Sequence, residues 1–230
     1  QAEGYQDNPK LRSGIPAVQS LAEQLREALP QARVTPRAAG FALASSEQRS
    51  FGIELIGVDP AGEPGVSTIP GMVTEGRFLE ETDSAAIVIG AAMARNPKVG
   101  LGDELTLLGS GRDGSFAAGI VEVTGIFDSG SSDMDRAFAE VPLGYFQETF
   151  AMAGHGNTIA IAVDQLAEVK SVQLTAQRVV SGHDGLVVLD WDQLHPGLRQ
   201  AIKADLSSGW FMYGVLVILV GFSVLNTQLM

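Results

Sequence analysis

Residues 109–114 read Gly-Ser-Gly-Arg-Asp-Gly and match GxGxxG, a pattern in which a helix N-terminus holds the pyrophosphate of a dinucleotide. That chemistry requires a strand before the glycines and a helix after them. Here residues 115–127 have the pattern of a strand instead. The glycines therefore favour a hairpin turn over a nucleotide site.

An acidic stretch offers two further kinds of chemistry. The Asp-Ser-Gly triplet at 128–130 follows an apolar pair, as in one half of an aspartic protease site, but no second triplet completes the carboxylate pair. Asp128, Asp133 and Asp135 also offer oxygen ligands for calcium. Their spacing differs from that of an EF-hand loop, which also needs a bidentate glutamate. A solvated acidic loop is the favoured interpretation.

The remaining candidates for catalysis or metal binding are sparse. The chain has no cysteine, which excludes disulfides, thiolate catalysis and cysteine zinc sites. His155, His183 and His195 are far apart and lack the i, i+4 spacing of a helical metal site. Neither a GxSxG elbow nor a P-loop is present, so any ATP must bind another chain. We therefore predict no catalytic, cofactor-binding or metal residue, and no enzyme activity in this chain.

The charge composition of the chain argues against two classes of binding partner. The 230 residues include 15 Lys and Arg against 27 Asp and Glu, a formal net charge of −12. Nucleic acids and anionic lipid headgroups both attract a positive surface, so neither is an expected ligand. Hydrophobic residues make up 45% and charged residues 18%, which is typical of a chain that folds around a core.

Two amphipathic helices would support the fold. The first lies between Pro16 and Pro30, with apolar side chains at spacings of three, four and seven. Its apolar positions are Val18, Leu21, Ala22, Leu25 and Leu29. The second begins at a cap on Asp164 and ends near Gly182. Its apolar positions are Leu166, Val169, Val172, Ala176 and Val180.

Most of the remaining elements are short strands. They are expected around residues 41–43, 51–55, 85–89, 104–108, 119–127, 137–141, 158–163 and 186–189. A short helix is expected over 142–152. The stretch Asp190-Trp191-Asp192 lies just before the last helix and should serve the structure, with capping by Asp and packing by Trp191. The two ends therefore combine helix and strand, whereas the middle is mostly strand. We predict an α+β fold with one lobe from residues 1–65 and 155–208 and an inserted β-rich lobe from 66–154.

The C-terminal residues 209–230 form a different kind of segment, because no charged side chain occurs after Asp205. A helix over 210–230 would span about 31 Å, roughly one hydrocarbon core. Trp210 and Tyr213 suit an interfacial aromatic belt, and Gly214 and Gly221 would let another helix approach. We predict a truncated transmembrane helix; the alternative is a buried C-terminal helix of a soluble protein.

Ten short motifs follow one another along the whole chain in a fairly specific order and spacing. They are GYQDNPKL, LPQARVTPR, IELIGVDP, EGRFL, IVIGAAMARN, VGLGDELTLLG, VEVTGIFDSG, AEVPL, DWDQL and FSVLNTQLM. Together they resemble the extracytoplasmic domain between the first two transmembrane helices of MacB/LolC/LolE-type ABC transporter permeases, the FtsX-like superfamily.

This resemblance implies an architecture and a set of partners. The chain would form a Porter-like α+β lobe with an inserted Sabre-like β-rich lobe in the periplasm. One transmembrane helix would precede Gln1 and three would follow, the first of them starting at Trp210, in a multi-pass protein of the inner membrane. The implied partners are a cytoplasmic ABC ATPase, a second permease copy or paralogue, and the lipid bilayer. The implied function is ATP-driven release or extrusion of a lipoprotein or other hydrophobic substrate.

One departure concerns the carrier or adaptor that some family members recruit. Lipoprotein-releasing members carry a proline-bearing hook between the strands that match 104–108 and 119–127. Here that loop is only residues 109–118 and has no proline, which argues against carrier recruitment by this loop. Two alternatives to a permease are a single-pass anchored binding domain and a membrane-tethered hydrolase.

If transport is correct, the residues that matter are mechanical. The helix from Pro196 to Ser208 should couple the outer lobes to the membrane, with Leu198, Ile202 and Leu206 on its apolar side. Exposed apolar residues of the lobes would cradle the hydrophobic substrate, although the pattern does not single them out.

Overall fold

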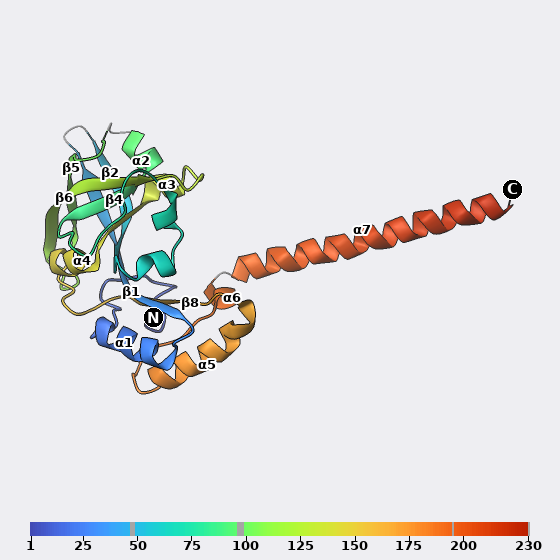
Figure 1. Ribbon diagram of the computed structural model, residues 1–230, viewed down its shortest axis with the longest axis horizontal. Coiled ribbons are helices and arrows are strands. Elements are labelled where there is room, and N and C mark those ends of the chain that lie inside the picture. Colours follow the sequence, from blue (N-terminus) through green and yellow to red (C-terminus); the bar gives the residue numbers. More distant parts are fainter. Residues whose placement is uncertain (47–48, 96–98, 195, 230) are drawn as a thin grey trace. The chain divides into compact units, whose positions relative to one another are not determined.

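The computed structural model describes residues 1–46, 49–95, 99–194 and 196–229. Within the last helix, only the backbone is described at residues 196, 198–203, 225–227 and 229. The chain forms two compact units, Gln1–Val188 and Leu189–Met230. The first unit contains helices and a large sheet (Figure 1), so the predicted α+β class is confirmed.

Six strands of the first unit close into a barrel. Neighbours around it run β2-β7-β4-β6-β5-β1, and β1 pairs with β2 again to complete the ring. The β2–β7 and β4–β6 pairs are parallel, and the other four pairs are antiparallel. Strand β8 extends the sheet beside the first half of β1, and β3 pairs with β6. The strands are β1(Arg33–Ser45), β2(Ser50–Val58), β3(Val73–Gly76), β4(Ala86–Gly90), β5(Glu104–Ser110), β6(Phe116–Phe127), β7(Phe138–Pro142) and β8(Thr158–Ala162).

The inner face of the barrel forms the main core. Alternate residues of its strands are buried in one cluster, as the period-two pattern requires. Helix α4(Leu143–Thr149) adds Phe146, whose ring stacks on that of Phe150 with 4.6 Å between centroids. A Cβ at Gly57 or Gly109 would lie within 2.7 Å of one of these two side chains. Gly57 lets Phe146 of α4 lie close against the sheet, and Gly109 does the same for Phe150, the residue after that helix.

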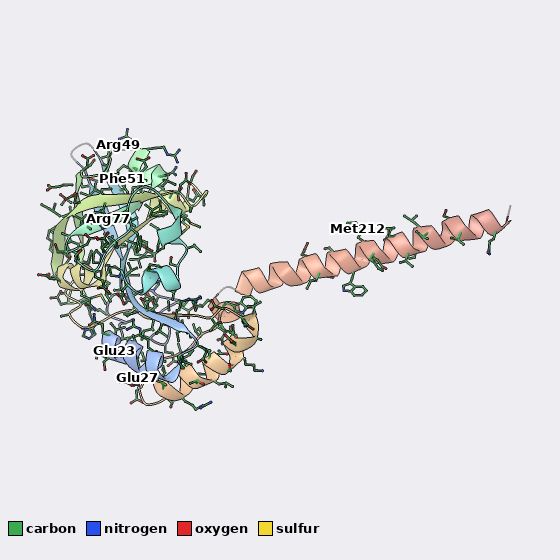
Figure 2. All side chains as sticks on the ribbon, in the orientation of Figure 1. Glu23, Glu27, Arg49, Phe51, Arg77 and Met212 are labelled. Carbon is green, nitrogen blue, oxygen red and sulfur yellow. The ribbon has the colours of Figure 1, made fainter. Side chains whose placement is uncertain are left out.

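A second core cluster joins the two ends of the first unit. Helix α1(Val18–Ala28) and helix α5(Val169–Val180) bury their apolar faces together with side chains of β1 and β8. The predicted helix between Pro16 and Pro30 is confirmed, and Glu23 and Glu27 lie on its exposed side (Figure 2). The lobe boundaries at 65 and 154 stay a prediction.

The start of the second amphipathic helix was predicted incorrectly. Asp164 does not cap it, because the helix begins at Val169 and the Asp164 carboxylate pairs with Arg33 at 2.6 Å. Leu166 lies in the 3-10 turn Leu166–Glu168 and is 82% exposed, so it is not on the buried face. An ion pair with the first residue of β1 therefore replaces the expected cap.

Residues 59–85, named here the covering segment, cross the outside of the barrel. They contain the 3-10 turns η1(Glu63–Gly65) and η2(Ile69–Met72) and the strand β3. Ile69 and Leu79 of this segment pack on outward-facing residues of the barrel strands, including Val88 and Phe127. The covered flank is the cluster formed by Val58, Ile69, Leu79, Ala86, Val88 and Phe127.

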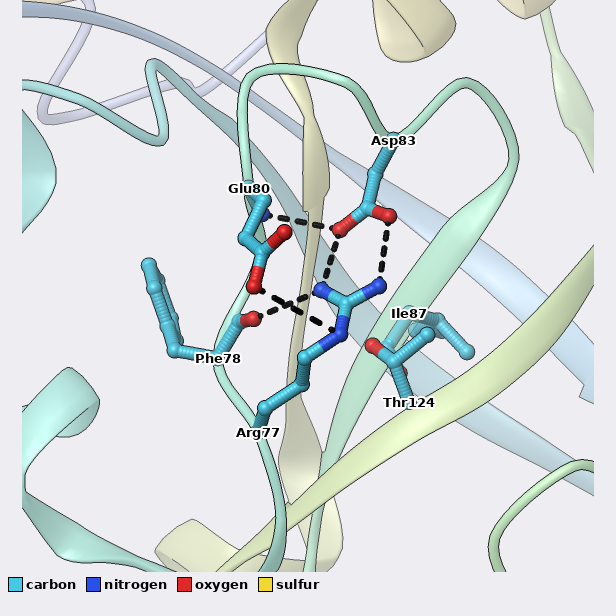
Figure 3. Close-up of polar contacts among 6 residues, drawn as sticks. All are labelled: Arg77, Phe78, Glu80, Asp83, Ile87 and Thr124. Atoms are coloured by element: carbon cyan, nitrogen blue, oxygen red, sulfur yellow. Dashed lines mark hydrogen bonds and ion pairs between the residues drawn. The ribbon is translucent and has the colours of Figure 1, made fainter.

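A polar clamp folds the end of the covering segment (Figure 3). The Arg77 guanidinium donates to both oxygens of Asp83 at 2.7 and 2.8 Å and to the Phe78 carbonyl at 3.1 Å. Asp83 also accepts the Glu80 N–H at 2.8 Å. The Arg77 hydrogen bonds lower the pKa of Asp83. A Cβ at Gly125 would lie 2.2 Å from the Arg77 carbonyl oxygen, so only glycine allows this crossing over β6.

The second unit consists of α6(Trp191–Leu194) and the long helix α7(Pro196–Leu229). The Asp190 carboxylate accepts the N–H groups of Asp192 and Gln193 at 3.0 and 3.1 Å, so an aspartate does cap a helix here, but that helix is the short α6 and not the last one. Trp191 is 42% exposed, so its predicted packing role is wrong. The predicted strand over 186–189 is wrong, because only Leu186 makes an isolated bridge, with Ala2. The first unit also contains two short helices, α2(Ala91–Arg95) and α3(Met134–Ala137).

Candidate functional site

The GxGxxG stretch is the turn between β5 and β6. The Gly111 N–H donates to the Ser115 carbonyl at 2.8 Å, and Gly114 has a φ of 87° that favours glycine. The Asp113 carboxylate accepts the Ser115 N–H at 2.8 Å. A strand follows this turn, so the predicted hairpin is confirmed.

The acidic loop uses its carboxylates to fix its own backbone. Asp135 is buried and accepts both the N–H and the hydroxyl of Ser129, at 3.0 and 2.6 Å. Asp128 accepts the Gly130 N–H at 3.0 Å. Among the residues that the structure describes, no three His, Asp or Glu side chains gather as a metal site would require. His155 bonds the Ala153 carbonyl through Nδ1, and His195 lies outside the described residues.

Two buried glutamates and a partly exposed arginine form a charged cluster between the covering segment and the barrel. Glu63 is fully buried and forms a bidentate ion pair with Arg37 of β1, with Nε to Oε2 at 3.1 Å. Glu140 of β7 is 1% exposed, and its Oε2 has no hydrogen-bond partner. Burial, reinforced by the charge of Glu63, raises the pKa of Glu140 to about 8. This cluster was missed in the sequence because Glu140 stands in an otherwise apolar strand.

The outside of β1, β5 and β6 is open, in contrast to the covered flank. Large apolar side chains point outward there, in alternation with buried Ala42, Leu107 and Ala117. The most exposed are Phe116 at 77%, Phe41 at 71%, Ile120 at 57% and Leu43 at 41%. We name the outward-facing set Phe41, Leu43, Leu108, Phe116, Ala118 and Ile120 the bare flank. Exposed apolar patches of this kind mark interaction surfaces.

A groove of about 410 Å³ adjoins the bare flank. It lies between the N-terminal residues 5–12 and the strands β1, β2 and β5, with Leu11 and Phe41 among its lining. Lys10 and Arg12 also line it, and Arg12 Nε donates to the Arg112 carbonyl at 3.3 Å. The bare flank therefore ends in a basic rim, in a chain whose net charge is −12.

A larger cleft of about 630 Å³ lies between α1, α4 and the covering segment. Its lining is polar and acidic, and two of its carboxylates are paired: Asp59 with Arg26 at 3.3 Å and Asp83 with Arg77. The other acids on its wall are Glu23, Glu81 and Glu148. This lining is that of a solvated cleft, not of a site for an apolar ligand.

The residues predicted for membrane packing lie on α7 and are exposed. Trp210 and Tyr213 meet edge to face with 6.5 Å between ring centroids. Gly214 and Gly221 have open space where a Cβ would stand, and Leu206 is 60% exposed. The side chains of Leu198 and Ile202 lie outside the described set. Residues Ala204–Val224 form one helical stretch long and apolar enough to cross a membrane, with a mean hydropathy of 1.7 and none of it buried.

Two solved structures of transporter domains have the same fold as this chain. One is the extracellular domain of the noncanonic ABC-type transporter YknZ from Gram-positive bacteria, with a TM-score of 0.60 and 18% identity over 80% of this chain and 95% of that one. The other is the periplasmic region of MacB from Actinobacillus actinomycetemcomitans, with a TM-score of 0.56 and 16% identity over 80% and 82%. No curated protein sequence matches the chain.

A protein-family model supplies the stronger evidence. The model of the MacB-like periplasmic core domain matches residues 3–179, which include every strand of the barrel, all of α1 and all of α5 except its last residue. The match covers most of the chain and agrees with the fold similarity to the YknZ and MacB domains. The chain belongs to the MacB-like periplasmic core domain family, the periplasmic domains of FtsX/MacB-like ABC transporter permeases.

Proposed function

We propose that this chain is the part of a permease that couples cytoplasmic ATP hydrolysis to release or extrusion of a lipoprotein or another hydrophobic substrate at the outer face of the inner membrane. The family match over residues 3–179 is the observation that carries this proposal. The groove of about 410 Å³ beside the bare flank supports a hydrophobic cargo, since Leu11 and Phe41 are among the residues that line it. The substrate would not need to pass through a wide pore.

The helix α7 would be the first transmembrane segment after the periplasmic domain. Its side chains from Leu206 to Val224 are uncharged and exposed on all sides, as lipid contact requires. Trp210 and Tyr213 would lie at the membrane interface, and Gly214 and Gly221 would face another helix. The candidate span begins at Ala204, slightly before the predicted residue 209. A further span before Gln1 and others after Met230 would complete a multi-pass protein.

The segment Pro196–Ser208 would transmit motion between the membrane and the periplasmic domain. It belongs to the same continuous helix as the candidate span, so a rotation or shift of one part reaches the other. Proline at Ala201 would remove a backbone hydrogen bond and bend this helix. We expect the variant Ala201→Pro to keep ATP hydrolysis but to lose substrate release, whereas Ala201→Leu should retain both. Unchanged release by Ala201→Pro would contradict the coupling role.

Recruitment of a periplasmic carrier would need a surface other than the hook position. The turn at that position is short, with Gly111 and Ser115 bonded to each other and no proline. A partner subunit that carries a hook, or an adaptor bound elsewhere, fits this chain better. The same turn also leaves the bare flank unobstructed.

The first test uses the complete protein. It would be co-expressed with the ABC ATPase encoded nearest to it and purified through a tag on the permease. We expect the ATPase to co-purify and to hydrolyse ATP, and a Walker-A lysine variant of that ATPase should co-purify without activity. Absence of any co-purifying ATPase, together with a single membrane span in the complete reading frame, would instead favour an anchored binding domain. The observation that favours this second function, an anchored binding domain, is the exposed apolar surface of the bare flank.

A further inference from the structure

The bare flank is organised in rows across three strands. The central row contains Leu43, Leu108 and Ala118, which are direct cross-strand neighbours. Phe116 lies opposite Ser110 in the row on one side, and Ile120 lies opposite Thr106 in the row on the other. The flank is therefore an ordered apolar strip on the outer wall of the barrel, with its long direction along the strands.

The two ends of this surface carry opposite charge. The end beside Phe41 and Phe116 has the groove with exposed Lys10 and Arg12, and Arg112 of the hairpin turn. Two carboxyls also lie there, those of Asp113, which is bonded within the turn, and of half-buried Glu54. The opposite end has Glu104 and Glu122 beyond Ile120, both exposed, and the exposed Arg49 in the turn between β1 and β2.

Glu104 and Glu122 face each other directly across β5 and β6. Like charges in this position destabilise a pair of strands. Arg77 interacts electrostatically with Glu122, but its guanidinium is already bound to both oxygens of Asp83. Among the residues that the structure describes, neither Glu104 nor Glu122 forms an ion pair.

We propose that the bare flank pairs with the bare flank of a second copy of this chain about a two-fold axis. The two sheets lie face to face with their strands antiparallel, so Lys10 and Arg12 of each copy meet Glu104 and Glu122 of the other. The central row of Leu43 and Leu108 packs on its own symmetry mate. A two-fold axis uses the same patch on both copies and closes the assembly at a dimer. This inference rests on the proposed permease function and names the surface through which two permease copies would meet.

The proposed pairing accounts for the exposed apolar side chains of the bare flank and for the charges at its two ends. Apolar faces of two sheets pack about 10 Å apart, which removes the exposed aromatic rings from water. Charged ends of opposite sign set the direction of pairing and disfavour the parallel alternative, in which acidic ends would meet. A patch of only six apolar residues per copy would hold two freely diffusing domains together weakly. Two copies held in one membrane have a high effective concentration, so weak pairing suffices and can open and close during transport.

The charge arrangement can be tested by exchange. In the membrane-embedded protein, Lys10→Glu with Arg12→Glu places acid against acid, and Glu104→Lys with Glu122→Lys places base against base. We expect each double variant to reduce pairing about tenfold, because charges at an interface select the partner. The quadruple variant restores the complementary pattern and should recover pairing. Loss in both doubles without recovery in the quadruple would overturn the two-fold model.

Pairing is measured by cross-linking, since residues 1–230 contain no cysteine and any cysteine elsewhere in the complete protein is first replaced by serine. The variant Leu43→Cys carries a single thiol near the proposed axis, and a short bis-maleimide joins two such thiols only when the flanks face each other. Leu166→Cys, at a residue 82% exposed in the 3-10 turn after β8, is the matched control. We expect strong dimer formation at position 43 and little at 166. Equal yields at the two positions would mean random collision and would overturn the proposal.

The outcome is separable from that of the proposed function. If the ATPase co-purifies and Leu43→Cys does not cross-link above the control, the permease assignment stands and this interface is wrong. If cross-linking and charge exchange succeed without an ATPase, the interface stands and the transport role fails. The charge variants change exposed residues, so circular dichroism should show an unchanged fold in all of them.

Discussion

The strand β6 begins at Phe116 and ends at Phe127, and these two rings differ in their exposure to solvent. Phe127 is fully buried beneath the covering segment, whereas Phe116 is 77% exposed on the bare flank. Both lie on the outside of the same barrel, so strand geometry alone does not decide burial. What differs is whether the chain itself supplies a second layer. The covered flank contributes to stability, and the bare flank keeps its apolar surface for a partner.

The largest expected effect comes from removing the buried ring. Phe127→Ala should lower the free energy of unfolding by about 3–5 kcal/mol, because the covering segment cannot fill the cavity. Phe116→Ala is the matched control in the same strand and should change it by no more than about 0.5 kcal/mol. Denaturant unfolding followed by circular dichroism measures both. Similar losses for the two variants would show that the flanks do not differ as described.

The second effect depends on pH and concerns Glu140. Its pKa is raised to about 8 in the folded protein from 4.5, so the folded state holds a proton that the unfolded state releases. The resulting stabilisation is complete below about pH 4.5 and is lost as the pH rises through about 8. Across this pH range the free energy of unfolding should fall by on the order of 2–4 kcal/mol. Glu140→Gln cannot ionise, so thermal unfolding from pH 5 to 9 should vary less in this variant than in the wild type.

The third effect is a loosening of the covering segment. Asp83→Asn removes the charge that Arg77 clamps, and we expect a loss of about 1 kcal/mol, since Arg77 is partly solvated and screened. Hydrogen exchange should rise in residues 73–85 and stay unchanged in α1. The variant Asp133→Asn, in a different exposed loop, controls for loss of a negative charge. Protection that is unchanged in both variants would mean that the clamp does not hold the segment.

The smallest effect on stability should be on the bare flank itself. Phe41→Ser with Ile120→Ser removes two exposed apolar side chains, and the free energy of unfolding should shift by less than about 0.5 kcal/mol. Pairing of two copies in the cross-linking assay should nevertheless fall. A large loss of stability would show that these side chains belong to the fold and not to an interface.

Sequence patterns predicted the helices better than the site. The apolar spacing of Val18 to Leu29 identified α1 because a helix buries one side, and the glycines at 109–114 identified the hairpin. The spacing of Phe41 and Leu43 indicates a strand in the same way whether its outer face is covered or bare. Only the three-dimensional course of residues 59–85 decides that question. The enclosed Glu140 was invisible for the same reason, since its partners Glu63 and Arg37 come from distant segments.

The closed barrel also constrains how this protein is made. Its ring is completed by the parallel pair of residues 54–58 with 138–142, and the cluster beneath α1 needs residues up to Ala176. If the chain emerges with its N-terminus first, β2 cannot pair with β7 until most of the domain has crossed the membrane. The barrel therefore stays open during this time. Pairings between such distant segments are slow to form and leave strand edges exposed in the meantime. We therefore expect the barrel to close only after export of the segment that carries β7. Helix α1 should pack against α5 and the sheet last.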